Sequence, residues 1–176
     1  MKIIAFEGPD KLGKTTQAKI IAEKLGWTYI KFPNEKYYSG KIIRSILNEE
    51  MPFEPASFQA LQILNRLETF EHLNPDENYI FDRYKLSGIV YGLADGLQEE
   101  WIREVCDLLP DPDFTLVFTG KPYGKDSDIY WQKQYEIAQL FHNEVVVYRY
   151  PWICVDGQTV EEVSEEILKM LPEGLL

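Results

Sequence analysis

The sequence predicts an α/β fold in which five parallel strands form a central sheet and helices cover both of its faces. Short apolar runs alternate along the chain with segments of helical periodicity, the pattern of strands joined by helical crossovers. A glycine-rich turn separates the first apolar run from the first helical segment. The chain has 176 residues with 45% hydrophobic content, enough to bury one core, so we expect a single domain spanning residues 1–176.

Five apolar runs have the length and composition of buried strands. They lie at residues 2–6, 28–32, 78–81, 114–119 and 152–155. Helical periods are predicted at approximately residues 14–25, 39–49, 55–73, 85–93, 98–109, 130–143 and 158–171, with Gly or Pro clusters between them. A polar, glycine-bounded segment follows the fourth strand. We interpret residues 120–130 as a short mobile lid over a ligand, with an ordinary surface loop as the alternative.

The turn after the first strand has the spacing of a phosphate-binding loop: Gly8, four residues, Gly13, Lys14 and Thr15. The glycines let successive backbone N–H groups point into one concavity, and the N-terminus of the next helix favours an anion there. Lys14 would place its charge on the β- and γ-phosphates of ATP, and Thr15 would be a Mg²⁺ ligand. The residues predicted to bind ATP in this loop are Gly8, Pro9, Asp10, Lys11, Leu12, Gly13, Lys14, Thr15 and Thr16. A glycine-rich turn without a ligand is the alternative.

Asp82 and Arg83 follow the third apolar run, at the end of a parallel strand where ligands of such sheets bind. The position of Asp82 suits a carboxylate that holds Mg²⁺ through water, because Mg²⁺ gives up its hydration shell reluctantly. Hydrolytic enzymes with this kind of loop commonly have a glutamate next, which orients water. Arg83 instead suits a second phosphate, which favours transfer over hydrolysis. A structural Asp/Arg pair is the alternative.

The net charge of −11, from 29 acidic and 18 basic side chains, argues against binding of long nucleic acid but not of a mononucleotide. No apolar run is long enough to cross a bilayer, so we expect no membrane contact, and the N-terminus is predicted to be a strand rather than a signal peptide.

We interpret Cys106 and Cys154 as free thiols in a reducing cytoplasm. His72 and His142 lack partners at ligand spacing and are assigned to no metal.

Further segments carry a family resemblance. They are Phe6-Glu7-Gly8-Pro9-Asp10, Phe32-Pro33, Asn65-Arg66-Leu67-Glu68, Asp82-Arg83-Tyr84-Lys85-Leu86-Ser87-Gly88 with Tyr91, and Trp152-Ile153-Cys154-Val155-Asp156-Gly157. Together they resemble the thymidylate kinases, a family of P-loop nucleoside monophosphate kinases, over nearly the whole chain. The resemblance implies a three-layer P-loop NTPase fold with a short lid.

The resemblance also implies roles for individual side chains. According to this resemblance, Asp10 contacts the acceptor sugar and the metal shell, Arg66 recognises the pyrimidine, and Arg83 binds the acceptor phosphate. The remaining acceptor residues that it implies are Phe32 and Pro33 near the phosphate, Ser87 in the Asp82–Gly88 motif, and Tyr91 beside the base and sugar. Asp156 is implied to lie near the donor adenine.

Three positions depart from the family pattern. Glu35 stands where an arginine usually follows Phe-Pro, and Lys36 is the candidate substitute for its phosphate contact. Gln62 stands where a phenylalanine usually stacks on the pyrimidine, and Phe58 is the nearest aromatic residue upstream. The usual lid arginine is missing, since no arginine occurs between Arg103 and Arg149. Lysines at positions 11, 121 and 125 are the cations available to cover the transferring group.

From these features we expect a Mg²⁺-dependent kinase that transfers the γ-phosphoryl group of ATP to dTMP, or to dUMP if the altered base pocket permits. The candidate catalytic residues are Lys14, Arg83, Asp10, Lys11 and Lys125. A homodimer is expected by resemblance and because the helix at 54–73 carries apolar residues on more than one side, namely Phe58, Leu61, Leu64, Leu67 and Phe70. The alternatives are a kinase of another nucleotide or of a nucleoside, and a non-catalytic P-loop module or nucleotide switch.

Overall fold

The computed structural model spans residues 1–176, and the structure describes residues 1–125 and 128–175. The strands are β1 (Ile3–Glu7), β2 (Thr28–Lys31), β3 (Tyr79–Asp82), β4 (Phe114–Thr119) and β5 (Trp152–Cys154). They pair in parallel in the order β2-β3-β1-β4-β5. The predicted five-stranded parallel sheet is thereby confirmed for the described residues.

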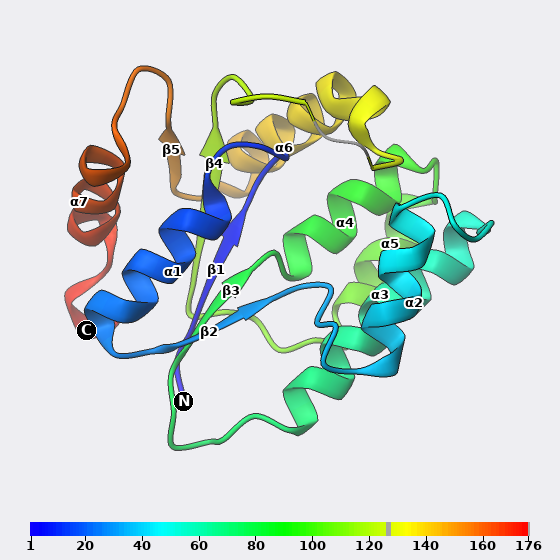
Figure 1. Ribbon diagram of the computed structural model, residues 1–176, viewed down its shortest axis with the longest axis horizontal. Helices are drawn as coiled ribbons and strands as arrows, with labels where there is room; N and C mark the ends of the chain where they lie inside the picture. Colours follow the sequence, from blue (N-terminus) through cyan, green and yellow to red (C-terminus); the bar gives the residue numbers. More distant parts are fainter. Residues whose placement is uncertain (126–127, 176) are drawn as a thin grey trace.

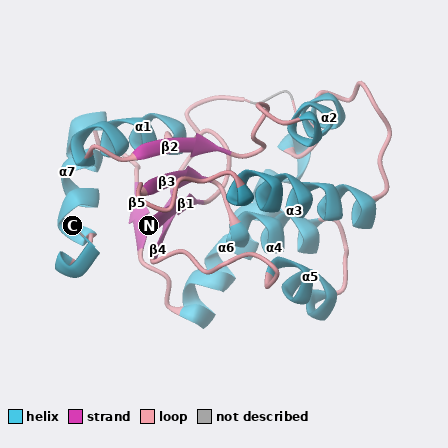
Figure 2. Ribbon diagram, turned by 90° about the horizontal axis from the view of Figure 1, so that it is seen from below, coloured by secondary structure: helices cyan, strands magenta, loops and turns pink. Residues whose placement is uncertain are grey.

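Helices connect successive strands and cover both faces of the sheet (Figures 1 and 2). They are α1 (Lys14–Leu25), α2 (Tyr38–Leu47), α3 (Pro55–Glu71), α4 (Lys85–Ala94), α5 (Glu99–Cys106), α6 (Gln134–Tyr148) and α7 (Val160–Met170), with short 3₁₀ helices at Trp131–Lys133 and Glu173–Leu175. Helices α1 and α7 lie against one face, and α3, α4, α5 and α6 lie on the other, with α2 packed on α3 (Figure 2).

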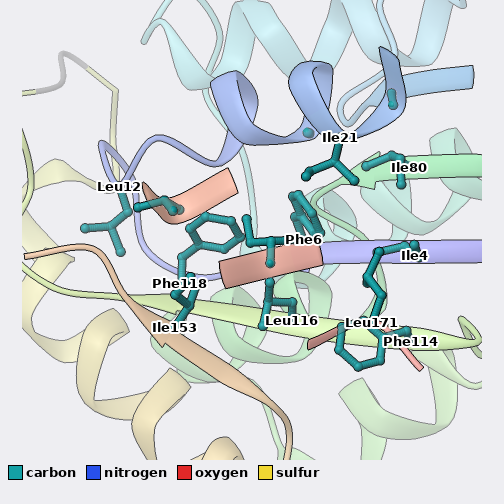
Figure 3. Packing of buried hydrophobic residues seen from close by; sticks show 14 of the residues in the cluster. Ile4, Phe6, Leu12, Ile21, Ile80, Phe114, Leu116, Phe118, Ile153 and Leu171 are labelled. Atoms are coloured by element: carbon teal, nitrogen blue, oxygen red, sulfur yellow. The ribbon is translucent and has the colours of Figure 1, made fainter. Parts of the chain in front are cut away.

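The core on the α1 face is built from alternate side chains of the strands. Ile4 and Phe6 of β1 pack with Phe118 of β4 beneath Ile21 of α1 (Figure 3). Leu12 of the phosphate loop enters the same cluster and is 1% exposed. Because a fully buried leucine is worth roughly 1.5–3 kcal/mol, Leu12 anchors the loop to the body of the domain.

Helix α6 is the element whose boundary differs most from the expectation. It begins at Gln134 and continues to Tyr148, whereas the sequence pattern predicted an end at 143. The extra turn contains Glu144 and Val145, which are both buried, and Glu144 pairs with Arg103 of α5. Tertiary packing therefore holds a β-branched run in a helix that its own propensity disfavours. Arg149 caps the C-terminus of the helix in the left-handed region, with a φ of 56°.

No helix of the described residues is both long enough and apolar enough to cross a lipid bilayer.

Strand β1 occupies the middle of the sheet, and all five of its residues are buried. The connection after β1 leads toward β2, whereas β4 lies on the opposite side of β1. The loop after β1 thus stands where the strand order reverses, which is the place where open α/β sheets bind ligands.

Candidate active site

The loop between β1 and α1 closes into a cradle because two of its positions suit only glycine. Gly8 has a φ of 129°, and a Cβ there would lie 2.5 Å from the backbone oxygen of Phe118. Gly13 has a φ of 79° and directly precedes the first residue of α1. The free N–H groups of the first helical turn therefore face the loop, which favours a bound anion.

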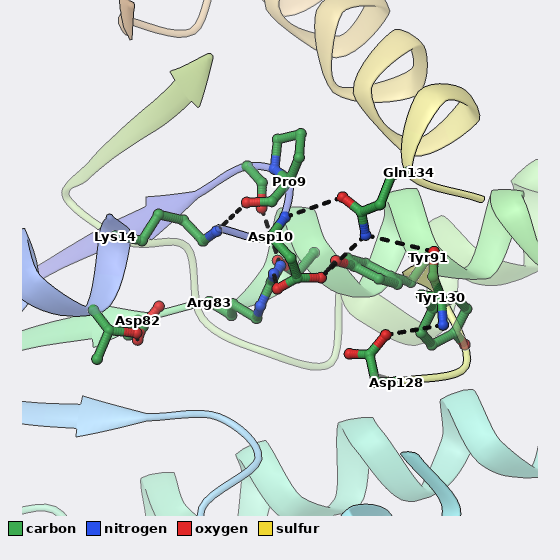
Figure 4. Close-up of polar contacts among 12 residues, drawn as sticks. Pro9, Asp10, Lys14, Asp82, Arg83, Tyr91, Asp128, Tyr130 and Gln134 are labelled. Atoms are coloured by element: carbon green, nitrogen blue, oxygen red, sulfur yellow. Dashed lines mark hydrogen bonds and ion pairs between the residues drawn. The ribbon is translucent and has the colours of Figure 1, made fainter. Parts of the chain in front are cut away.

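Lys14 folds back over this loop, and its ammonium donates a hydrogen bond to the carbonyl oxygen of Pro9 (Figure 4). Its side chain is buried, and burial together with the nearby Arg83 guanidinium lowers the pKa of Lys14 to about 7. Burial of an ammonium is costly, the carboxylates of Asp10, Asp82 and Glu7 offset only part of that cost, and a phosphate would add negative charge at the loop. The loop is therefore built to receive an anion.

The side-chain oxygen atoms of Thr15, Asp82 and Tyr29 lie together beside the loop. The Thr15 hydroxyl donates a hydrogen bond to Oδ2 of Asp82 at 2.5 Å, and the Tyr29 hydroxyl donates to the same oxygen at 3.3 Å. Hydroxyl and carboxylate oxygens are ligands that Mg²⁺ accepts, directly or through water, so these residues fit such an ion. The sequence pointed to Thr15 and Asp82 but not to Tyr29, which belongs to a different strand.

Asp10 and Arg83 form an ion pair next to this cluster (Figure 4). Arg83 also donates from Nη1 to the carbonyl oxygen of Gly8 at 3.1 Å and to the Ser87 hydroxyl at 3.3 Å. Burial alone would raise the pKa of Asp10, but the charges of Arg83 and Lys14 hold it well below its usual range. The carboxylate therefore stays ionised at any physiological pH.

Two further side chains hold the Asp10 carboxylate from the other side. The Tyr91 hydroxyl donates to Oδ2 of Asp10 at 2.9 Å, and the Arg83 guanidinium lies 5.1 Å from the centre of the Tyr91 ring. Gln134 accepts from the Asp10 backbone N–H at 3.3 Å and donates to Asp10 Oδ2 at 3.4 Å. Gln134 carried no signal in the sequence, because it comes from α6, far along the chain.

Glu7, the last residue of β1, fixes the start of α4. Its buried carboxylate accepts hydrogen bonds from the backbone N–H groups of Tyr84, Leu86 and Ser87 at 2.9, 3.0 and 3.1 Å, and from the Ser87 hydroxyl. Burial raises the pKa of Glu7 even though these donors favour the charged form. Glu7 thereby positions the segment that carries Arg83 and Ser87.

A cavity beside the phosphate loop contains most of the predicted acceptor residues. It is lined by Asp10, Lys31, Phe32, Pro33, Arg44, Leu47, Asn48, Gln59, Gln62, Arg66, Arg83, Ser87, Tyr91, Asp128 and Tyr130. The peptide bond between Phe32 and Pro33 is cis. We call this space the acceptor cavity. It brings together residues of the loop, of β2, and of α2, α3, α4 and the segment before α6.

Arg66 is the most informative residue of the acceptor cavity. The residue is 4% exposed, and its Nε and Nη1 atoms, both sealed from solvent, have no hydrogen-bond partner among the residues that the structure describes. The guanidinium carbon lies 5.9 Å from the centre of the Phe32 ring. Arg66 also lines the acceptor cavity, and because a guanidinium offers only donors, the residue suits a ligand that carries acceptor atoms.

The aromatic wall of the acceptor cavity differs from the expectation based on Phe58. Phe58 is 1% exposed and packs against Phe53, so it lies behind the cavity rather than in its lining. Tyr130 lines the cavity instead, with its ring centre 4.7 Å from that of Tyr91 in an edge-to-face arrangement. Its hydroxyl donates to Asp95 at 2.6 Å, which fixes the ring. Gln62 lines the cavity at the position expected.

The predicted lid at 120–130 divides into parts with different neighbours, and its residues 126 and 127 lie outside the described residues. The Tyr123 N–H donates to the carbonyl oxygen of Lys11 at 2.8 Å, and the Lys121 N–H donates to Asp156 at 2.6 Å. The part at 120–125 thus runs from the turn after β5 toward the phosphate loop, with Lys125 exposed at its end. Asp128 and Tyr130 reach the acceptor cavity.

The other predicted loop residues lie at the surface or away from the acceptor cavity. Lys11 and Thr16 are exposed on the phosphate loop and the first turn of α1, and Lys11 has a φ of 58°. Lys36 lines a separate hollow along β2, where its ammonium lies 5.9 Å from the centre of the Tyr37 ring. Glu35, which replaces the expected arginine, pairs with Arg44 at 2.8 Å.

A loop shaped for a triphosphate, with a second cavity beside it and an arginine between the two, is suited to moving a phosphoryl group from one small molecule to another. The fold and site together define a P-loop phosphotransferase of the nucleotide kinase class.

Comparison with known proteins identifies the family. Residues 6–167 match the model of the thymidylate kinase family. The thymidylate kinase of Schizosaccharomyces pombe is 31% identical over 149 residues, which cover 79% of this chain and 71% of that protein. A probable thymidylate kinase of Methanocaldococcus jannaschii is 31% identical over 180 residues, 96% of this chain and 94% of that protein. The solved thymidylate kinase structure from Candida albicans superposes with a TM-score of 0.79 at 27% identity, covering 96% of this chain and 90% of that one. The chain belongs to the thymidylate kinase family and is an ATP-dependent enzyme of that family.

Proposed function

We propose that the protein transfers the γ-phosphoryl group of ATP to dTMP, giving ADP and dTDP, and that it accepts dUMP as a second substrate. The observation that carries the choice of base is that Arg66, which bears a buried guanidinium, lines the acceptor cavity. A guanidinium offers only donors, which suit the O4 acceptor of thymine or uracil. The exocyclic amino group of cytosine is itself a donor and would be left unpaired.

The phosphate of the acceptor would contact Arg83, at the junction of the acceptor cavity and the phosphate loop. Arg83 has a fixed position because Gly8, Ser87 and Asp10 hold its guanidinium. Tyr91 and Asp10 face the same space and would contact the sugar. Because the Tyr91 ring lies close by, we expect ribonucleotides to be poorer acceptors than deoxyribonucleotides.

The donor phosphates would lie in the loop formed by residues 8–16, with Lys14 on the migrating group and Asp156 near the adenine. The oxygen atoms of Thr15 and Asp82 would hold Mg²⁺, and the ion, when bound, neutralises charge on the donor phosphates. The reacting oxygen of the acceptor is already ionised near neutral pH, so no side chain has to remove a proton. The protein contributes alignment, positive charge and exclusion of water.

Two broader proposals accompany this activity. We propose a homodimer that pairs through α3, because Leu64 is 53% exposed on a helix whose opposite side, including Phe58 and Ile63, is buried. A cytoplasmic location accords with the two free cysteines, Cys106 and Cys154.

Coupled measurement of ADP formation with a panel of monophosphates tests the proposed activity. We expect turnover with dTMP and dUMP, weak turnover with UMP and dCMP, and little ADP without an acceptor. Slow ADP formation that no acceptor stimulates would indicate a nucleotide switch. No turnover with any member of the panel would indicate a non-catalytic module, and preference for a purine monophosphate would indicate another kinase.

A further inference from the structure

The reaction needs positive charge at a point where this chain lacks two expected arginines. Glu35 occupies one of the positions and is paired with Arg44 at 2.8 Å. The other is missing because no arginine occurs between Arg103 and Arg149. A phosphoryl group that moves between two anions needs cations on its oxygens, and one well-placed side chain can change the rate by ~10³ or more.

Lys31 is the last residue of β2 and stands beside the proposed metal site. In the sheet register it is opposite Asp82 of β3. Alternate residues of a strand share a face, so Lys31 leaves β2 on the same face as Tyr29. The Tyr29 hydroxyl already reaches Asp82 Oδ2 at 3.3 Å. Lys31 lies two residues beyond Tyr29 along β2, toward the carboxyl ends of the strands, where the phosphate loop lies.

The two cavities of the site meet at Lys31. It lines the acceptor cavity, and it also lines the hollow formed by the phosphate loop together with Lys14, Thr15 and Asp82. Of the residues that the structure describes, Asp10 and Arg83 also line both spaces, and they pair with each other. Within the described part of the chain, no hydrogen bond or ion pair engages the Lys31 ammonium. Lys31 is therefore an exposed cation available to a group that passes between the two cavities.

We propose that Lys31 is a catalytic residue that places its ammonium on the phosphoryl group in transfer, in place of a missing arginine. The inference rests on the proposed function. In the step, the bond between the γ-phosphorus of ATP and the β,γ-bridging oxygen breaks, and its electron pair stays on ADP. A phosphate oxygen of the acceptor supplies the electron pair of the new bond. Lys31 remains protonated and carries no group.

Steady-state kinetics of Lys31→Met, Lys31→Arg and a matched control, Lys24→Met, test the proposal. Lys24 is an exposed lysine in the last turn of α1, so its replacement removes the same charge away from the site. We expect Lys31→Met to lower kcat at least about tenfold with a smaller change in either KM, because the charge acts mainly in the transition state. Lys31→Arg should recover most of the loss, and Lys24→Met should match the wild type. Unchanged kcat in Lys31→Met would overturn the proposal.

Binding of ADP with aluminium fluoride, a mimic of the transferring group, reports the same charge without turnover. Calorimetry should show that aluminium fluoride tightens ADP binding in the wild type and in Lys24→Met when dTMP is present. The tightening should fall at least about tenfold in Lys31→Met, while affinity for ADP alone stays constant. Equal tightening in all three proteins would refute the role of Lys31. If the wild type phosphorylates none of the monophosphates but the tightening still depends on Lys31, the proposed function fails and the role of Lys31 stands.

Discussion

The Arg83 guanidinium and the Asp10 carboxylate form an ion pair that joins the end of β3 to the phosphate loop. Their side chains are 14% and 18% exposed, so little water screens the pair. Both residues also line the acceptor cavity. An acceptor phosphate that binds Arg83 must therefore share the guanidinium with Asp10, and the strength of phosphate binding depends on that competition.

Replacing Asp10 with asparagine should expose this competition. Asp10→Asn leaves Arg83 without its counter-charge, and we expect a loss of roughly 1–3 kcal/mol in unfolding free energy, less than for a fully buried pair. Added dTMP should restore part of the loss, because its phosphate supplies a new negative charge. Thermal unfolding with dTMP and with thymidine, which lacks the phosphate, measures this. The difference between the two ligands should be larger in Asp10→Asn than in the wild type, and an equal or smaller difference would contradict the prediction.

Lys14→Ala should abolish turnover and leave the fold intact. The lysine supplies charge to the migrating group, so we expect turnover to fall by ~10³ or more. The melting temperature should not fall, because the variant no longer buries an ammonium whose charge is only partly compensated. Turnover measurements test the predicted loss of activity, and thermal unfolding tests the unchanged stability. Lys24→Ala is the control on the same helix. Near-normal turnover in Lys14→Ala would show that the loop does not hold the donor phosphates.

The local motifs of this site can be predicted from the sequence, because each depends on the geometry of residues close together in the chain. The spacing of Gly8, Gly13 and Lys14 specifies a strand, a turn and a helix, and the structure has β1, the loop and α1 at those places. Asp82 ends a buried strand, and parallel pairing with β1 then brings it to the same edge of the sheet as the loop. Fold class and loop position therefore follow from residues close together in the chain.

Side chains that reach the site from distant elements could not be predicted in this way. Tyr130 lines the acceptor cavity because the segment before α6 packs over α4, and Gln134 reaches Asp10 from the first turn of α6. Lys31 looks like an ordinary strand-end lysine until the sheet register sets it opposite Asp82. Phe58 was proposed as the nearest aromatic residue in sequence, but its position on α3 directs it into the core.

Arg66 should make the enzyme reject dCMP. Its guanidinium, on a residue that lines the acceptor cavity, offers only donors and so favours a base that carries acceptors, and an unpaired cytosine amino group would cost roughly 1–3 kcal/mol. We expect kcat/KM for dCMP to be at least about tenfold below that for dTMP. One methyl group is worth only about 1 kcal/mol, so dUMP should approach dTMP more closely.

An Arg66→Met variant provides the control for base selection. It should lower kcat/KM for dTMP by about ten to a hundredfold, since a charged hydrogen bond contributes roughly 1.5–3 kcal/mol, and it should narrow the gap between dTMP and dCMP. Specificity constants for dTMP, dUMP, dCMP and UMP with both proteins decide the matter. Equal use of dCMP and dTMP by the wild type would remove Arg66 from base recognition.

Leu64→Glu should convert the proposed dimer into a monomer. Leu64 projects from α3 with 53% of its surface exposed, and a charge there would be buried without a partner if two copies of α3 met. Light scattering should give twice the 20.6 kDa chain mass for the wild type and the single mass for Leu64→Glu. Leu108, 64% exposed after α5, serves as the control, because Leu108→Glu should leave the dimer intact. A wild type of monomer mass at micromolar concentration would refute the dimer.

Stability above neutral pH should depend on Cys106. The residue is fully buried where α5 packs against α4, and burial raises the pKa of its thiol to about 11 from 9.0. The folded protein therefore keeps this proton up to about pH 11, whereas the unfolded chain releases it near pH 9. Between these values the unfolded state binds fewer protons, so the free energy of unfolding falls as pH rises. Across the whole window the thiol accounts for a loss of roughly 2–3 kcal/mol.

Cys106→Ala isolates this contribution, because both proteins carry the same tyrosines and lysines. Removal of the sulfur leaves a small cavity, which lowers stability by the same amount at every pH. Urea unfolding at pH 8 and at pH 10.5 should then show the advantage of the wild type over Cys106→Ala shrinking as pH rises, because only the wild type pays to keep a thiol protonated. A constant difference between the two proteins at both pH values would mean that Cys106 titrates in the folded protein as it does in the unfolded chain. In that case the packing of α5 on α4 would not seal the thiol from water.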